Sequence, residues 1–438
     1  MNTLIFEGVR CFHTRQECSL KPITLLVGEN SSGKTTFLAL TRIAWDIALG
    51  DLSEDLFNEE PFLLGAYDQV ATYRGGKAGR VRSFTMGLKF SLGPKFKESR
   101  WFAEEATISA RFVPQGAQSN LDEWSFVCGQ VNIEAKMNTE GTAQGLRINT
   151  PTGTQGRDER LLRPLVVSPS RLLRNLPIFF SHGGSSILDK SPLSPETEIG
   201  YLRNIFHQMD QAFGPRPYAS APIRTRPQRT HDPLKDVPKP EGSHVPMVLA
   251  RMAASDSSDW EKLKSSLRNF GKASGLFTDV EIRRKGNKDS DPFQIAVKMS
   301  GSAFNLVDVG YGVSQVLPIV VDALQEPPRS NFLLQQPEVH LHPKAQAELG
   351  SFLAVLAKEH KKRFIIETHS DYLVDRIRMD IRDKKSLTPD DVAILYFERT
   401  DRGVQIHPLE LDRDGNIVNA PSTYRQFFLA EERRLLAI

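Results

Sequence analysis

The 438-residue sequence lacks the features of membrane-spanning, secreted and metal-stabilised chains. No apolar run approaches the ~20 residues that a spanning helix requires. The first ten residues lack the basic start and long apolar stretch of a secretory signal. Only three cysteines are present, without a CxxC spacing, which argues against a disulfide framework or a zinc site. We therefore expect a cytoplasmic protein with no membrane partner.

The sequence also lacks a large excess of positive or negative charge. The 56 Lys and Arg residues against 53 Asp and Glu leave a formal net charge of +3, so the composition permits nucleic-acid binding without indicating it. A hydrophobic content of 39% with 25% charged residues is typical of a soluble folded chain rather than a disordered one. The length suits one core with an insertion or two.

The first third of the chain predicts strands around one helix. Residues 4–6 begin a strand, and residues 23–27 form a short apolar run that is typical of a buried strand. Helical spacing of apolar residues over 35–49 predicts a helix that stops at Gly50. Residues 84–90 and 106–112 alternate with a period of two, which predicts antiparallel strands with one solvated face.

The middle of the chain changes composition several times. Residues 138–157 are polar and rich in Gly and Thr, which predicts a loop or a frayed hairpin. The basic stretch 157–174 is interpreted as a solvated helix face. Residues 215–246 hold too many prolines for a helix or a central strand and predict an ordered connector or an exposed loop.

The helix expected next carries apolar residues from Trp260 to Phe270, with Ser258 as its N-cap and Gly271 as its stop. The remaining expected elements are strands at 280–283, 293–299, 331–334 and 364–367, a helix at 343–358 and a hairpin over 392–406. We expect three regions: an ATPase lobe over 1–137, an inserted helical and proline-rich region over 138–300, and a second ATPase lobe over 301–438.

The strongest motif is GENSSGKT at residues 28–35, which fits GxxxxGK[ST] between a strand and a helix. Its glycines let successive backbone N–H groups point at phosphate oxygens, and the helix N-terminus adds partial positive charge. Lys34 is predicted to contact the β- and γ-phosphates, and the Thr35 hydroxyl to bind Mg²⁺. The predicted ATP-binding residues of this loop are Gly28, Glu29, Asn30, Ser31, Ser32, Gly33, Lys34, Thr35 and Thr36.

Three later segments narrow the class: GYGVSQ at 310–315, FLLQQPEVHLHP at 332–343 and FIIETHS at 364–370. Together with the P-loop, their order and spacing resemble the ABC-type ATPase head, with its signature motif, strand with an acidic tip, D-loop and switch histidine. The PEVHLHP and ETHS strings look like the OLD and RecF-like branch of AAA ATPases, whose members act on nucleic acid or in phage defence. The resemblance covers residues 1–50 and about 300–400.

The resemblance assigns further residues to the site. Gly310, Gly312 and Ser314 would form the signature that contacts the γ-phosphate bound by another subunit, with Gly310 standing where the family usually has serine. His369 would be the switch residue that hydrogen-bonds the same phosphate. The alternatives are two turn glycines and a buried histidine that closes a strand. Gln69 is the candidate for the Q-loop glutamine.

The strand tip departs from the family pattern. Relatives carry two adjacent carboxylates there, whereas this sequence has Gln335, at the metal position, and Gln336, at the position of the catalytic base. A carboxamide cannot accept a proton with a useful pKa, and losing a general base costs roughly 10²- to 10⁴-fold in rate. Glu338 is the nearby carboxylate that could compensate, or it caps the next helix or bonds the D-loop. His340 and His342 are expected to pack in the D-loop rather than bind metal.

These observations predict an α/β P-loop NTPase of the ABC-head type, with an antiparallel β subdomain and an inserted helical and proline-rich segment. ATP and Mg²⁺ would bind between two subunits of a dimer or higher oligomer, because each half-site lacks what the other supplies. Weak ATP hydrolysis is expected. The catalytic candidates are Gln336, Glu338 and His369, and the metal candidates are Thr35 and Gln335.

The resemblance implies a nucleotide-gated sensor or scaffold in anti-phage defence. Because only 69 residues follow His369, enough for a hairpin and a terminal helix at most, we expect no Toprim nuclease domain and therefore a separate effector protein, a nuclease or a toxin. The terminal helix over 424–436 would dock on its own head or bind that effector, for which the 215–246 segment is the other candidate. The rival hypothesis is a RecF- or SMC-like DNA-repair ATPase that clamps duplex DNA; a transporter motor fits the motifs less well.

Overall fold

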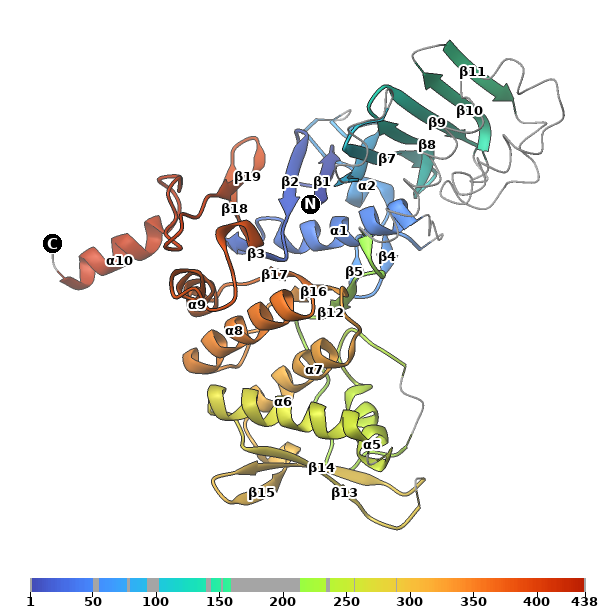
Figure 1. Cartoon of the computed structure of the whole chain (residues 1–438). Coiled ribbons are helices and arrows are strands. Elements are labelled where there is room, and N and C mark those ends of the chain that lie inside the picture. The colour runs from blue at the N-terminus through green and yellow to red at the C-terminus, as the bar shows by residue number, and fades with distance from the viewer. Residues whose placement is uncertain are drawn as a thin grey trace. The chain divides into compact units, whose positions relative to one another are not determined.

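The computed structural model describes residues 2–49, 55–76, 79–92, 102–138, 143–150, 153–158, 213–233, 237–255, 257–288 and 290–436. The chain divides into two compact units (Figure 1). Unit 1 comprises residues 1–20, 31–216 and 398–406, and unit 2 comprises residues 21–30, 217–397 and 407–438. Both units contain sheets covered by helices, and the predicted α/β class is confirmed.

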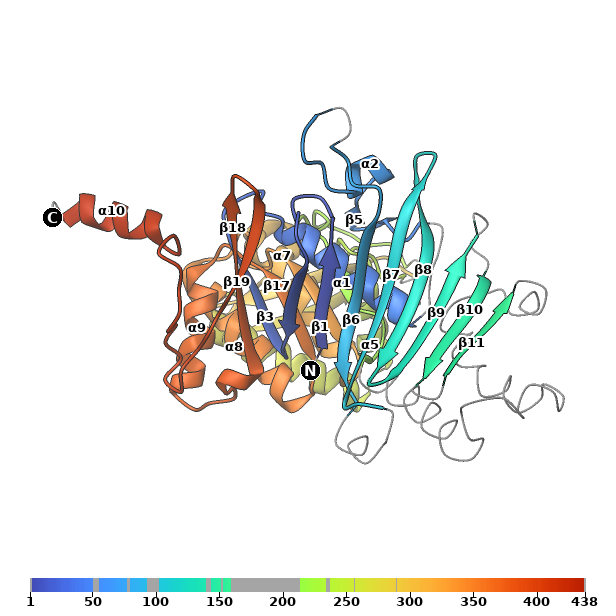
Figure 2. The ribbon, with the colours of Figure 1, turned by 90° about the horizontal axis from the view of Figure 1, so that it is seen from above.

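Unit 1 is built on an eight-stranded sheet with the order β11-β10-β9-β8-β7-β6-β1-β2. Helix α1 (Lys34–Leu49) lies across this sheet and packs mainly on β6 and β7 (Figure 2). The strands are β1 (Asn2–Glu7), β2 (Gln16–Leu20), β6 (Phe84–Ser91), β7 (Glu105–Gln115), β8 (Gln118–Cys128), β9 (Val131–Met137), β10 (Ala143–Thr150) and β11 (Gly153–Asp158). Their pairing is antiparallel, as the period of two in β6 and β7 predicts. A short hairpin of β4 (Asn58–Glu59) and β5 (Phe62–Leu63) precedes the single turn of α2 (Tyr67–Val70).

Helix α1 is bound by side-chain contacts to the segment that begins at residue 213. Asp46 is 2% exposed, and both of its carboxylate oxygens accept hydrogen bonds from Arg216, at 2.7 and 2.9 Å. The neighbouring Trp45 donates its indole N–H to the carbonyl oxygen of Phe213 at 3.1 Å. A buried carboxylate is tolerated when it is paired in this way, so the ion pair fixes the start of the connector on α1.

A six-stranded sheet with the order β12-β16-β17-β3-β18-β19 belongs mainly to unit 2, and only residues 398–406 of β18 and β19 are assigned to unit 1. The strands are β3 (Ile23–Gly28), β12 (Tyr218–Ser220), β16 (Asn331–Gln335), β17 (Arg363–Glu367), β18 (Val392–Thr400) and β19 (Gly403–Leu409). The first five strands in this order pair in parallel. Their near-continuous apolar sequences suit strands that are buried on both faces. The predicted strands at 23–27, 331–334 and 364–367 are confirmed.

Three helices of unit 2 lie next to the strands of this sheet in the chain: α7 (Tyr311–Gln325) precedes β16, α8 (Pro343–Glu359) follows β16, and α9 (Asp371–Arg382) follows β17. Helix α9 shows that the prediction of only a hairpin and a terminal helix after His369 is wrong. Its apolar residues Leu373, Val374 and Ile377 recur at helical spacing and are buried, so the sequence did carry the signal. The short helices η5 (Leu306–Asp308) and η6 (Pro389–Asp391) precede α7 and β18, and α10 (Gln426–Leu436) ends the described chain.

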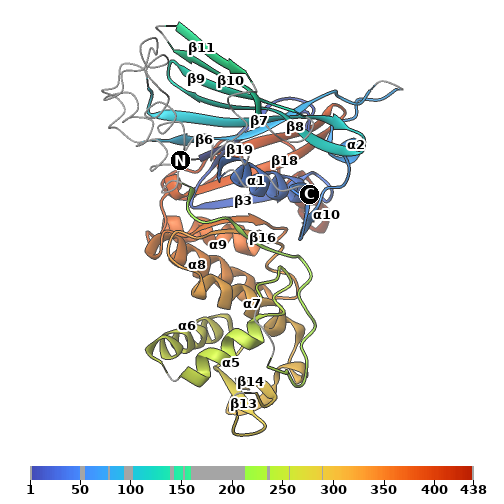
Figure 3. The ribbon, with the colours of Figure 1, turned by 90° about the vertical axis from the view of Figure 1, so that its right-hand side faces the viewer.

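The rest of unit 2 pairs helices with a small antiparallel sheet, β13-β14-β15 (Figure 3). Its strands span Asp279–Arg284, Phe293–Met299 and Ser302–Asn305, and α5 (Val245–Ser255) and α6 (Ser258–Ser274) pack beside them. The predicted caps of α6 are wrong. Ser257 is the N-cap, and the helix runs through Gly271 to end at Gly275, which has φ 75°. Gly271 lies inside the helix, and a Cβ at that position would stand 2.4 Å from the ring of Phe277, so this close contact accounts for the glycine.

The inserted region is ordered where it is described. Strands β10 and β11 pair as a hairpin, which decides between the loop and the hairpin expected over 138–157. Most of the basic stretch, residues 159–174, lies outside the described residues. Within the proline-rich segment, β12 occupies the edge of the parallel sheet, in keeping with the rule that proline is excluded from central strands. No helix in the described ranges is long and apolar enough to cross a membrane.

Candidate nucleotide-binding site

Three parallel strands of unit 2 bring their carboxyl ends to one edge of the sheet. Gln335 at the end of β16 lies opposite Glu367 at the end of β17, and Glu367 lies opposite Leu26 in β3. In open parallel sheets, ligands bind at this edge because the loops after the strands converge there. The first residues of the P-loop, the amide pair and the ETHS sequence therefore share one edge.

The P-loop has the backbone conformation that its glycines allow. Gly28 has φ 141°, and a Cβ there would stand 2.5 Å from the carbonyl oxygen of Phe397. Gly33 has φ 91°, and a Cβ there would stand 2.7 Å from Sγ of Cys11. Side chains rarely tolerate such φ values, so both positions require glycine. Ser31 between them also has a positive φ, of 57°, which completes the tight curl.

The loop leads directly into the N-terminus of α1. Lys34 is 2% exposed, and its Nζ donates to Oγ of Ser32 at 3.4 Å. Thr35 is exposed, while the hydroxyl of the next residue, Thr36, accepts a hydrogen bond from Arg10 at 3.3 Å. Backbone N–H groups, one lysine and a helix N-terminus form a set of donors that fits the phosphates of a nucleotide, and the exposed Thr35 hydroxyl fits a Mg²⁺ ligand.

The two amides at the strand tip have different environments. Gln335 is 4% exposed, and its Nε2 donates to the carbonyl oxygen of Ser220 in β12 at 3.3 Å. Gln336 is half-buried with φ 42°, and its backbone N–H donates to the carbonyl oxygen of Glu367 at 2.8 Å. The side chain of Gln335 is thus partly engaged by the edge strand, which leaves its Oε1 as the candidate metal ligand.

Glu338 links the loop after β16 to the end of β17. It is 6% exposed, and its Oε1 accepts the backbone N–H of His369 at 2.7 Å. Its Oε2 is buried without a hydrogen-bond partner among the described residues. Burial raises the pKa of this carboxyl group above its usual value. The expectation that Glu338 caps the following helix is wrong, because His342 is the N-cap of α8.

Arg224 is the residue that sequence reasoning missed at this edge. Its side chain is 3% exposed, and its guanidinium donates to the carbonyl oxygens of Gln335 and Gln336, at 3.3 and 3.4 Å. Its backbone N–H donates to Oε1 of Gln315 in α7 at 3.3 Å. Burial lowers the pKa of Arg224 to about 10, and the Glu338 carboxylate partly opposes that shift. No motif marks an arginine in a proline-rich segment, so only the fold reveals this contact.

The predicted signature forms the exposed start of α7. Gly310 is the N-cap, with open space around it and no side chain to satisfy the first N–H groups of the helix. The ring of the exposed Tyr311 lies 5.9 Å from the ring of His340. A Cβ at Gly312 would stand 2.9 Å from the carbonyl oxygen of His340, so the two backbones are in close contact. Ser314 is buried, and its hydroxyl donates to the Tyr311 carbonyl oxygen at 2.9 Å. The signature and the D-loop are therefore adjacent, with Ser314 turned into its own helix.

Two remaining candidates have clear positions. His369 is exposed, which excludes the alternative of a buried histidine at the end of a strand. Gln69 lies in unit 1, where its Oε1 accepts the backbone N–H of Ala66 at 3.2 Å and caps α2. Its side chain thus has a structural partner there, and a Q-loop role for Gln69 stays a prediction.

Taken together, the sheet, the P-loop between β3 and α1 and the convergent strand ends define an ABC-type P-loop NTPase fold.

Residues 253–375 match the family described as "AAA domain, putative AbiEii toxin, Type IV TA system". No protein with a curated description matches the chain. Among solved structures, the chain is similar to the Smc head domain with an extended coiled coil bound to the C-terminal domain of ScpA from Pyrococcus furiosus (12% identity, TM-score 0.42, covering 99% of this chain and 100% of that one). It is also similar to the Smc head domain with a coiled coil and joint from Pyrococcus yayanosii (10% identity, TM-score 0.44, 99% and 100%) and to the SMC head domain from Thermotoga maritima (12% identity, TM-score 0.39, 93% and 98%).

Proposed function

We propose that this chain is an ATP-binding ATPase head that acts as a nucleotide-gated dimeric sensor or scaffold, in anti-phage defence together with a separate effector. The observation that carries the proposal is the P-loop, with its two obligatory glycines and with Lys34 at the start of α1. Thr35 and Gln335 would hold Mg²⁺, which when bound would offset the charge of the phosphates.

The exposed start of α7 supports pairing between two copies. Its uncapped N–H groups and partial positive charge suit a phosphate, and the open space around Gly310 lets a nucleotide on another molecule approach the backbone. The adjacent D-loop residue His340 is also exposed. Two P-loops could then each be completed by the α7 start of the other copy.

The strand tip supports slow turnover. Gln335 and Gln336 supply no base, so the role would pass to Glu338, which lies two residues further on, is buried and is held through one oxygen by the His369 N–H. A head that binds ATP and hydrolyses it slowly spends most of its time in the bound state. That behaviour suits a switch whose ATP-bound form holds or releases a partner better than it suits a fast motor.

The experiment is a light-scattering mass measurement with and without saturating ATP. We expect ATP to raise the mass of the parent to that of a dimer or larger assembly. Lys34→Ala should lose ATP affinity by at least about tenfold, the scale of one lost charge-assisted contact, and should therefore fail to assemble. Gly310→Trp has room within its own chain, so it should bind ATP yet stay monomeric. An ATP-bound parent with an unchanged mass contradicts the pairing, and unchanged ATP affinity in Lys34→Ala contradicts the P-loop assignment.

A second candidate function, clamping of duplex DNA, is favoured by the hairpin between β13 and β14. Arg283, Lys285 and Lys288 are exposed on it and can reach phosphates. If this function holds, the protein without any partner should bind duplex DNA with an affinity that falls steeply with salt. The double variant Lys285→Ala/Lys288→Ala should reduce that salt dependence by about two counterions.

A further inference from the structure

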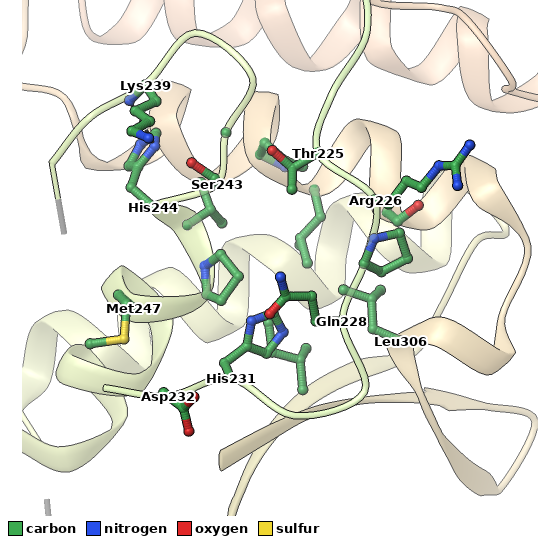
Figure 4. A pocket seen from close by; sticks show the side chains of 18 of the residues that line it. Thr225, Arg226, Gln228, His231, Asp232, Lys239, Ser243, His244, Met247 and Leu306 are labelled. Carbon is green, nitrogen blue, oxygen red and sulfur yellow. Dashed lines mark hydrogen bonds between the residues drawn. The ribbon is translucent and has the colours of Figure 1, made fainter. Parts of the chain in front are cut away.

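A cavity of about 370 Å³ lies in unit 2 between the proline-rich connector and α7 (Figure 4). Its volume is within the roughly 300–1,000 Å³ of small-molecule sites. The connector contributes residues 225–228, 231, 232, 237, 239 and 242–246 to the lining, α5 contributes Met247, and α7 contributes Ser314, Leu317 and Pro318. Ser314 is the one residue that the described lining shares with the predicted nucleotide site, so a molecule bound in this cavity would be distinct from the nucleotide at the P-loop.

Much of the cavity wall is apolar. Three proline rings line it, Pro227 and Pro246 from the connector and Pro318 from α7, together with Met247 and Leu306. A proline ring presents a compact apolar surface with no N–H donor, and a methionine side chain adapts to the shape of what it packs against. Walls of this kind can pack against the face of a planar ring.

His231 supplies a fixed polar group at this cavity. Its backbone exchanges two hydrogen bonds with Phe293, at 2.8 and 3.0 Å, and its ring stacks on the Phe293 ring with centroids 5.4 Å apart. The ring nitrogen Nε2 is buried without a hydrogen-bond partner among the described residues. Burial lowers the pKa of His231, so the ring is neutral and can donate or accept through Nε2 depending on its tautomer.

Other polar groups of the lining complement His231. Gln228, three residues earlier, adds a carboxamide that both donates and accepts. Arg226 and Lys239 contribute two cations to the lining, against the single carboxylate of Asp232 (Figure 4). An occupant would therefore need a hydrogen-bonding edge, a flat apolar face and a negative charge.

We propose that this cavity binds a nucleotide, with the base between the apolar walls, its edge hydrogen-bonded to His231 and Gln228, and its phosphate near Arg226. A nucleobase has a flat face and adjacent donors and acceptors, and a phosphate provides the negative charge. The same chemistry is offered by a free mononucleotide and by the terminal nucleotide of a single strand. Binding here is independent of the P-loop.

The connector segment around Gly242, which lines the cavity, packs directly on α7. At Gly242, with φ 77°, a Cβ would stand 2.5 Å from Cβ of Pro318, so the connector backbone rests on the helix without space between them. An occupant that shifts the connector therefore acts on the helix that begins at Gly310. This consequence rests on the proposed function, whereas the binding itself does not.

The test is calorimetric titration of the Lys34→Ala protein with AMP, GMP, CMP and UMP, because that variant removes the P-loop as a competing site. We expect saturable binding of at least one of them, with one site per chain. Gln228→Ala and Arg226→Ala, each added to Lys34→Ala, should weaken it at least about tenfold, as expected for the loss of one hydrogen bond or one phosphate contact. Arg229→Ala is the control, because Arg229 is exposed, outside the cavity and paired with Asp308.

A second titration uses a 5′-phosphorylated single strand of about ten nucleotides. Tighter binding of the strand identifies a nucleic-acid end as the occupant, and binding of the free mononucleotide alone identifies a metabolite. The proposal is overturned if none of these probes binds the Lys34→Ala protein at millimolar concentration, or if Gln228→Ala and Arg226→Ala bind as Arg229→Ala does. Failure of ATP to bind the parent would contradict the proposed function and leave this result standing.

Discussion

The backbone N–H of His369 donates to Oε1 of Glu338 at 2.7 Å, which ties the carboxylate after β16 to the end of β17. One oxygen is fixed, and Oε2 is left buried with no hydrogen-bond partner in the described part of the chain. A carboxylate held through one oxygen can bind and orient a water through the other. Glu338 is thus placed to serve as the base that the amide pair cannot supply.

Glu338→Gln should reduce ATP hydrolysis by roughly 10²- to 10⁴-fold while ATP still binds, because the amide cannot take the proton. Burial raises the pKa of Glu338, so the acid limb of the parent's pH–rate profile should have its midpoint above the usual 4.5. The folded state then binds this proton more tightly than the unfolded state. The contribution of Glu338 to the free energy of unfolding therefore falls as the pH rises through the pKa of this group in the folded state.

Glu359→Gln is the matched control for that experiment, since Glu359 is exposed near the end of α8. It should keep the rate and the acid limb of the parent. If Glu338→Gln hydrolyses ATP at the parental rate in a phosphate-release assay, the base lies elsewhere.

Gln336→Glu should raise the steady-state rate of hydrolysis, because it places a carboxylate where relatives of the ABC class carry one. Gln336 is half-buried, so the new carboxylate keeps contact with solvent and should be ionised at neutral pH. The gain should be about tenfold or more, measured as phosphate release at saturating ATP. An equal rate in Gln336→Glu and in Gln336→Ala would show that this position does not contact the attacking water.

Arg224→Met should destabilise the protein by about 2–4 kcal/mol, because it removes the guanidinium donor from the carbonyl oxygens of Gln335 and Gln336 and leaves Glu338 without a nearby cation. The Gln336 oxygen still accepts the backbone N–H of Val339 at 3.2 Å. Arg224→Lys should recover part of this loss. Urea unfolding measures both, and Arg229→Ala, on the exposed part of the same segment, should stay within about 0.5 kcal/mol of the parent. Parental stability in Arg224→Met would mean that water replaces the guanidinium at no cost.

Deleting residues 426–438 should abolish co-purification of an effector while preserving ATP binding and cooperative melting. Helix α10 exposes Leu435 and Leu436, by 85% and 65%, whereas Arg425 just before it pairs with Asp371 and Asp375 and remains in the truncated chain. Leu435→Glu/Leu436→Glu should have the same effect, with Arg433→Ala as control. A truncated chain that unfolds would indicate self-docking, and one that keeps all its partners would point to the proline-rich segment.

The motifs predicted the parts of the site that depend on local backbone. The P-loop glycines and the buried strands follow from short-range pattern, because a tight turn and a buried strand each restrict their own residues. Arg224 could not be predicted, since its partners lie more than a hundred positions away in sequence. The capping role expected for Glu338 failed for a similar reason: which side chain reaches a helix end depends on how the loop turns, and His340 turns it with φ 66°.

The short strand β12 has a consequence for how copies of this chain can meet. It is the outermost strand of the parallel sheet beside β16, only three residues long, with Pro217 before it and Pro222 two residues after it. Neither proline carries an N–H group, and such a brief edge cannot template a further strand. Lateral extension of the sheet into a second molecule is therefore blocked on that side, which protects the chain against edge-to-edge aggregation.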